Sequence, residues 1–174
     1  MSGPDRRQTF APMRAYVAVG SNLGDRWAHL AFAARQIRAD SRVSLLRASR
    51  VWDAEPLGPP QPRYLNAVLE LETRLTAQGL HALLQLTERG AGRRRTRRWA
   101  ARTLDLDLLL YGDQVIETPR LVLPHPGIVS RRFVLAPLAE LCPDRLVPGT
   151  GFTVAQLLAA APPLDLFPVG IYPG

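Results

Sequence analysis

Two aspartates stand in a short run that otherwise has the composition of a buried β-strand. The run is RTLDLDLLLYG, residues 102–112, and it places Asp105 and Asp107 two positions apart. Residues two apart in a strand point to the same face, so both carboxylates share one face while alternate leucines take the other. Carboxylates this close repel each other, and partial burial increases the repulsion. The two carboxylates therefore need a neighbouring positive charge.

That charge is available immediately before the run. GRRRTRRW, residues 92–99, and Arg102 supply six arginines within one short segment. Salt bridges from these arginines to the two aspartates are one interpretation. A magnesium site is the other, because Mg²⁺ is commonly held by one or two carboxylates together with substrate phosphates and water. Guanidinium groups can clamp phosphate oxygens bidentately, so the acids and arginines together favour metal-triphosphate chemistry.

The composition suits one globular domain. The chain has 174 residues, of which 47% are hydrophobic and 21% charged, and a net charge of +7. We expect residues 1–12 to form a flexible tail and residues 13–174 a single domain. No apolar run approaches the length of a membrane span or of a secretory signal, and the single cysteine, Cys142, fits a reducing cytoplasm. We therefore expect a cytoplasmic protein that does not bind a membrane. We also expect a monomer that does not bind nucleic acid.

The order of expected elements indicates an α+β fold. Alternating and helical patterns predict strands over 14–20, 42–51, 64–73 and the aspartate run, and helices over 26–39 and 77–89. Further helices are expected over 131–141 and 153–160. Four prolines make residues 55–63 a loop. The order strand, helix, strand, strand, helix, strand predicts a ferredoxin-like βαββαβ sheet, with helices on one face and active-site loops on the other.

Other motifs carry less information alone. GSNLG, residues 20–24, lacks the spacing of a phosphate-binding loop, and a simple strand-to-helix turn is an equal alternative. His125 stands between two prolines, which suits a rigid exposed imidazole or a turn residue. Gln85 and Glu88 share one helical edge, and spacing alone favours a solvated edge. Histidines and cysteines do not cluster, so we expect no zinc site.

Taken in order, these segments resemble a known enzyme family. GSNLGD, EPLG, YLNAV, GRRRTRRW, RTLDLDLLLYG, LPHP and SRRFVLAPLAEL are similar to the motifs of 6-hydroxymethyl-7,8-dihydropterin pyrophosphokinases, over residues 13 to about 143. That family transfers a pyrophosphoryl group from ATP to the hydroxymethyl oxygen of the pterin and releases AMP, in folate biosynthesis. The resemblance implies ATP and this pterin as small-molecule partners, and it also implies a ferredoxin-like fold.

The resemblance assigns roles to individual residues. It implies two magnesium ions held by Asp105 and Asp107, which are also the acidic members of the catalytic set. The catalytic arginines that it implies are Arg93 and Arg102. The implied ATP contacts are Gln85, Glu88, Arg95, Arg120, His125 and Arg131. The implied pterin contacts are Ala54, Glu55, Pro56, Leu57, Tyr64, Asn66, Trp99 and Phe133.

Two other functions compete with this interpretation. A nucleotidyltransferase also uses paired acids on a strand near a Gly-Ser turn, but there the acids follow the turn closely, and here they come much later in the chain. A basic nucleic-acid-binding module would use the arginine segment and would bind generic DNA or RNA in a salt-sensitive way. That module leaves Asp105 and Asp107 unexplained.

Overall fold

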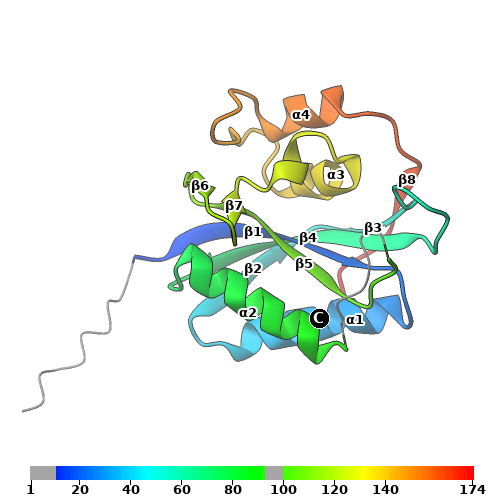
Figure 1. Ribbon diagram of the computed structural model, residues 1–174, viewed down its shortest axis with the longest axis horizontal. Coiled ribbons are helices and arrows are strands. Elements are labelled where there is room, and N and C mark those ends of the chain that lie inside the picture. Colours follow the sequence, from blue (N-terminus) through cyan, green and yellow to red (C-terminus); the bar gives the residue numbers. More distant parts are fainter. Residues whose placement is uncertain (1–10, 93–99) are drawn as a thin grey trace, which may run out of the picture.

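An antiparallel sheet forms the centre of the molecule (Figure 1). The computed structural model describes residues 11–92 and 100–174. The strands follow the order β5-β1-β4-β3-β8, and β2 also pairs with β4. Their bounds are β1 (Met13–Ser21), β2 (Val43–Ala48), β3 (Val51–Ala54), β4 (Tyr64–Thr73), β5 (Asp105–Tyr111) and β8 (Leu166–Gly170). The short strands β6 (Ile116–Glu117) and β7 (Val122–Leu123) form a separate pair.

Two helices cover one face of this sheet. They are α1 (Arg26–Ala39) and α2 (Ala77–Gly90), and their bounds agree with the sequence-based expectation to within a residue. The Asp25 side chain accepts a hydrogen bond from the Ala28 amide at the start of α1, which satisfies one of the free amides there. Thr76 does the same for the start of α2. Leucines of both helices pack against alternate residues of β1 and β4 in the larger core.

The expectation that helices cover only one face is wrong. On the opposite face, α3 (Arg132–Leu141) and α4 (Val154–Ala160) enclose a second core (Figure 1). The sheet presents apolar residues such as Val68 and Leu109 on that side, and these are buried against Leu135 and Leu138 of α3. Apolar sheet surface needs such a cover. The part of this face that carries Asn66, Asp105 and Asp107 lines a cavity.

The strand expected over 42–51 is divided in two. Both β2 and β3 pair with β4, and Ser49 lies between them, buried. The Ser49 amide donates to the Val68 carbonyl, and the Ser49 hydroxyl accepts from the Val68 amide. Both backbone groups of Val68 therefore keep a hydrogen-bond partner where the strand is interrupted. Strand β8 was not anticipated. Among residues 11–92 and 100–174, no helix is long and apolar enough to span a membrane.

Candidate active site

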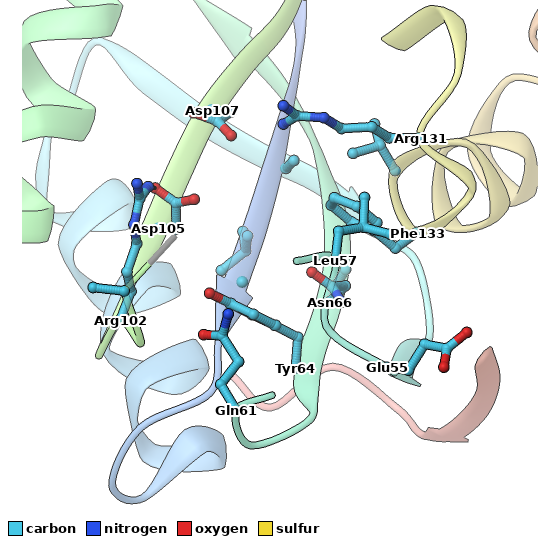
Figure 2. Close-up of a pocket in the computed structure, with 16 residues that line it drawn as sticks. Glu55, Leu57, Gln61, Tyr64, Asn66, Arg102, Asp105, Asp107, Arg131 and Phe133 are labelled. Atoms are coloured by element: carbon cyan, nitrogen blue, oxygen red, sulfur yellow. Dashed lines mark hydrogen bonds and ion pairs between the residues drawn. The ribbon is translucent and has the colours of Figure 1, made fainter. Parts of the chain in front are cut away.

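A cavity of about 250 Å³ opens on the sheet face that α3 covers incompletely (Figure 2). Strands β1, β4 and β5 form its floor, and its walls come from loop 55–63, the segment before β5 and the start of α3. Nine residues predicted from the sequence line it: Glu55, Leu57, Tyr64, Asn66, Arg102, Asp105, Asp107, Arg131 and Phe133. The structure thus gathers in one cavity the residues that the sequence places in four separate segments.

The two aspartates form the acidic side of the cavity. Asp105 and Asp107 lie on β5 opposite Gly20 and Ala18 of β1, and both side chains face the cavity. Between them, the Leu106 amide donates to Glu88 Oε1 at 2.8 Å. This bond lies on the side of β5 away from β1, so it helps fix the strand that carries both carboxylates.

Glu88 and Gln85 have different environments. The expectation of a solvated edge is wrong for Glu88, which is 7% exposed because it faces β5. Gln85 is exposed, and its Nε2 lies 3.1 Å from the His81 ring. Neither residue lines the cavity.

Arg102 links the acidic side to the preceding segment. One of its guanidinium nitrogens donates to Asp105 Oδ1 at 2.9 Å. Partial burial lowers the pKa of Arg102, but the Asp105 carboxylate outweighs this effect and the net shift of the pKa is upward. Arg102 therefore stays charged and already neutralises one of the two acids. The salt-bridge interpretation is confirmed for this pair.

His125 approaches the acidic side from the segment that follows β7. Its Nδ1 accepts a hydrogen bond from the Gly127 amide at 3.0 Å, and its Nε2 lies 3.9 Å from Asp107 Oδ1. Burial and the nearby Arg131 charge lower the pKa of His125. The imidazole is therefore neutral at pH 7, with its proton on Nε2, facing the carboxylates. The ring is three-quarters buried, so the expectation of an exposed imidazole is wrong.

The opposite wall, which we call the ring side, consists of Leu57, Asn66 and Phe133 (Figure 2). Asn66 is 7% exposed, and its Nδ2 has no hydrogen-bond partner among the described residues. A buried amide without a partner is costly and points to a polar ligand group. Gly20 leaves room for it, because a Cβ there would lie 3.2 Å from Asn66 Oδ1. An apolar residue, an aromatic ring and a free amide suit a flat heterocycle with polar edges.

Two residues of this site were missed in the sequence. Asn22 is 1% exposed, and its Nδ2 donates to Gln61 Oε1 at 2.9 Å and to the Pro62 carbonyl at 3.0 Å. Its Oδ1 accepts from the Arg102 amide at 2.8 Å. Gln61 lines the cavity. Asn22 thus joins loop 55–63 to the segment before β5. The sequence signal for Asn22 was the GSNLG motif, but the spacing of that motif does not distinguish a residue that joins two segments from one in a simple turn.

The other predicted residues lie elsewhere or cannot be placed. Ala54 is buried at the end of β3, and Arg120 is exposed in the turn between β6 and β7. Pro56 does not line the cavity. Arg93, Arg95 and Trp99 lie outside the described residues.

The acidic side suits magnesium better than a metal that needs a full set of protein ligands. No group of three or more histidine, cysteine or acidic side chains that could hold a metal ion occurs within 11–92 and 100–174. The cavity instead presents two carboxylates beside open space. Magnesium is commonly held in this way, with phosphate and water oxygens completing its ligands.

Comparisons with known proteins agree with this geometry. The sequence model described as 7,8-dihydro-6-hydroxymethylpterin-pyrophosphokinase (HPPK) matches residues 16–143. The chain belongs to this family. It is 43% identical over 150 residues to a Pseudomonas aeruginosa protein named 2-amino-4-hydroxy-6-hydroxymethyldihydropteridine pyrophosphokinase, and the match covers 86% of this chain and 92% of that one. A Bacillus subtilis protein of the same name is 42% identical over 129 residues, 74% of this chain and 77% of the relative.

Solved structures show the same fold at low sequence identity. A Plasmodium falciparum HPPK-DHPS structure superposes with a TM-score of 0.70 at 10% identity, covering 88% of this chain. This chain corresponds to 46% of that longer one. The likeness therefore supports the fold that positions the cavity, and the family assignment depends on the sequence matches.

Proposed function

We infer that this protein is an ATP-dependent pyrophosphokinase of folate biosynthesis. It transfers the pyrophosphoryl group of ATP to the hydroxymethyl oxygen of 6-hydroxymethyl-7,8-dihydropterin and releases AMP. A bond forms between that oxygen and the β-phosphorus, the bond from the β-phosphorus to the AMP oxygen breaks, and the hydroxyl proton is released. Family membership carries this inference and favours it over a nucleotidyltransferase or a nucleic-acid-binding module.

We propose that the acidic side receives the triphosphate. Asp105 and Asp107 would hold two magnesium ions, which when bound would neutralise phosphate charge and bring the phosphates next to the hydroxyl group. The Nε2 proton of His125 and the Arg131 guanidinium can donate to phosphate oxygens. Arg102 would leave Asp105 and contact the phosphates that are being transferred. Gln85, Glu88, Arg95 and Arg120 remain proposed ATP contacts by resemblance, as Arg93 remains a proposed catalytic arginine.

We propose that the ring side receives the pterin. The unpartnered amide of Asn66 supports this most directly, because a pterin edge offers both donors and acceptors. Phe133 would stack on the ring, and Leu57 would contact it. Tyr64 and Trp99, together with the backbone from Ala54 to Leu57, remain further proposed contacts. In this arrangement the hydroxymethyl group would point across the cavity to the acidic side.

The finer assignments belong to the same proposal. We propose a ferredoxin-like core in which β2 and β3 together serve as its second strand, supported by the order β5-β1-β4 with β2 and β3 beyond β4. We also propose a single domain from residue 13 onward, a monomer and a cytoplasmic location.

The decisive experiment for this function distinguishes AMP from ADP. Protein, magnesium and ATP are mixed with and without 6-hydroxymethyl-7,8-dihydropterin, and the nucleotide products are separated. We expect AMP in amounts equal to the pterin consumed, and none without pterin. Stoichiometric ADP would mean transfer of a single phosphoryl group and would overturn the assignment.

A further inference from the structure

The C-terminal part of the chain lies against β3 and the loop that supplies Leu57 and Gln61 to the cavity. We call residues 161–172 the strap. At its start, Arg132 donates to the carbonyls of Ala161 at 2.9 Å and Pro162 at 3.1 Å, which ties the strap to α3. At its end, Tyr172 is 7% exposed and donates its hydroxyl to the Leu30 carbonyl at 2.7 Å, which ties it to α1. The strap is therefore fixed to helices on both faces of the sheet (Figure 1).

Between these anchors the strap meets the start of loop 55–63. Strand β8 pairs antiparallel with β3, and the pairing continues one residue further, where the Glu55 amide donates to the Asp165 carbonyl at 3.0 Å. The Asp165 amide donates in return to Glu55 Oε1 at 2.9 Å. This second bond turns the Glu55 side chain toward the strap, away from Asn66 (Figure 2). The backbone of the loop is thereby fixed at its first residue.

The same aspartate also holds the end of the loop. Arg63 donates to Asp165 Oδ2 at 2.9 Å and to the Asp165 carbonyl at 3.3 Å. The Arg63 guanidinium also bonds Asp53 and lies 5.3 Å from the centre of the Phe167 ring of β8. One strap residue thus contacts the first and last residues of a proline-rich loop whose interior supplies Leu57 and Gln61 to the cavity.

We propose that the strap positions loop 55–63 for the pterin and that Asp165 is its positioning residue, an inference that rests on the proposed function. The match to the family model ends at residue 143, before the strap. Asp165 touches the loop and not the acidic side, so its effect falls on pterin binding and not on ATP. A loop that is held at both ends loses less conformational entropy when a ligand orders it, so the ligand binds more tightly.

The experiment compares charge reversal at Asp165 with a matched control. Asp165→Lys places a cation beside Arg63, Asp165→Glu keeps the carboxylate, and Asp144→Lys makes the same charge change at an exposed aspartate before the strap. We expect Asp165→Lys to raise the KM for pterin about fivefold to tenfold and to leave kcat and the ATP dissociation constant within about twofold. Asp165→Glu should recover most of the affinity, and Asp144→Lys should match the unmodified protein.

Hydrogen exchange of residues 55–63 gives a second readout that does not depend on activity. Asp165→Lys removes the side-chain bond to Arg63 and keeps the backbone bonds to Glu55, so the loop should exchange faster toward Arg63, while the Glu55 amide and β5 should be unchanged. Unchanged exchange and an unchanged KM for pterin would overturn the proposal. A uniform fall of kcat, both affinities and melting temperature would also overturn it, because that pattern indicates only a structural role. If the unmodified protein released no AMP, the proposed function would fail, and exchange would still decide whether Asp165 holds the loop.

Discussion

The acidic side of the cavity comes from one strand, whereas the ring side is assembled from three separate parts of the chain. Asp105 and Asp107 are fixed by the alternation of β5, by its pairing with β1 and by the Glu88 bond between them. The ring side combines Leu57 from a loop, Asn66 from β4 and Phe133 from the first turn of α3. In the proposed function, the charges that serve the chemistry would be fixed on one strand, and substrate recognition would depend on how distant segments meet.

The largest expected effect tests the acidic side. Asp107→Ala should lower kcat about 100-fold or more, because the phosphates lose the metal ligand that stabilises the developing charge. The fold should persist, since removing one of two like charges relieves repulsion. AMP release and thermal unfolding measure the two effects. Asp113→Ala, at an exposed aspartate just beyond β5, is the control and should be near normal. Near-normal turnover of Asp107→Ala at low magnesium would contradict the metal role.

The next effect concerns the arginine that joins Asp105. Arg102→Ala should lower the single-turnover rate about tenfold to 100-fold and change ATP affinity only modestly, because its contact with the phosphates forms in the reacting state. Arg102→Lys should recover part of the loss, since an ammonium group cannot reproduce the bidentate guanidinium. Rapid-quench kinetics beside equilibrium ATP titration separates the two quantities. An intact rate at saturating ATP with weakened binding would make Arg102 a ground-state anchor.

A smaller and different effect is expected on the ring side. Asn66→Ala should raise the KM for pterin about tenfold or more, because the pterin edge loses its hydrogen-bonding partner. The rate at saturating pterin should change little. Asn66→Asp keeps the size and one acceptor but removes the donor, so it identifies which half of the amide matters. Steady-state kinetics with pterin as the varied substrate gives both parameters, and an unchanged KM would exclude Asn66 from the pterin site.

The smallest effect on activity is expected at the residue that joins the two regions. Asn22→Ala removes the bonds to Gln61, Pro62 and the Arg102 amide, and should lower the free energy of unfolding by about 1–3 kcal/mol. The KM for pterin and the turnover should each worsen a few-fold, since both loops lose their connection. Asn22→Asp keeps the acceptor for Arg102 and loses the donors to loop 55–63, so it should affect pterin binding more than turnover. Equal effects of both variants on kcat would contradict the assignment of the Asn22 donors to pterin binding and of its acceptor to turnover.

Sequence patterns predicted the parts of the fold that depend on local periodicity. Helices α1 and α2 begin at capping residues, and β4 alternates apolar and polar residues, so their bounds were confirmed. Strand β8 has a proline in its centre and no polar alternation, and it is a strand because β3 offers it an edge. The cover of the second sheet face by α3 and α4 depends on long-range packing, which periodicity does not specify.

The site shows the same distinction. Spacing predicted that the two aspartates share one face of a strand, and both line the cavity. Asn22 and Gln61 were missed, since their roles arise from hydrogen bonds between segments 39 residues apart. The burial of Glu88 was missed because it requires the position of β5 relative to α2. The resemblance implied Asn66 and Phe133 as pterin contacts, which stay predictions, and the fold brings both to one wall of the cavity.

The most direct test of the division between the acidic side and the ring side is transfer of β-labelled phosphate in a single turnover, at saturating ATP and pterin. The unmodified protein, Asp107→Ala and Asn66→Ala are compared under the same conditions. We predict that the label moves to the pterin at similar rates in the unmodified protein and Asn66→Ala, and at least about 100-fold more slowly in Asp107→Ala. Equal slowing of both variants, or full speed in Asp107→Ala, would contradict the account.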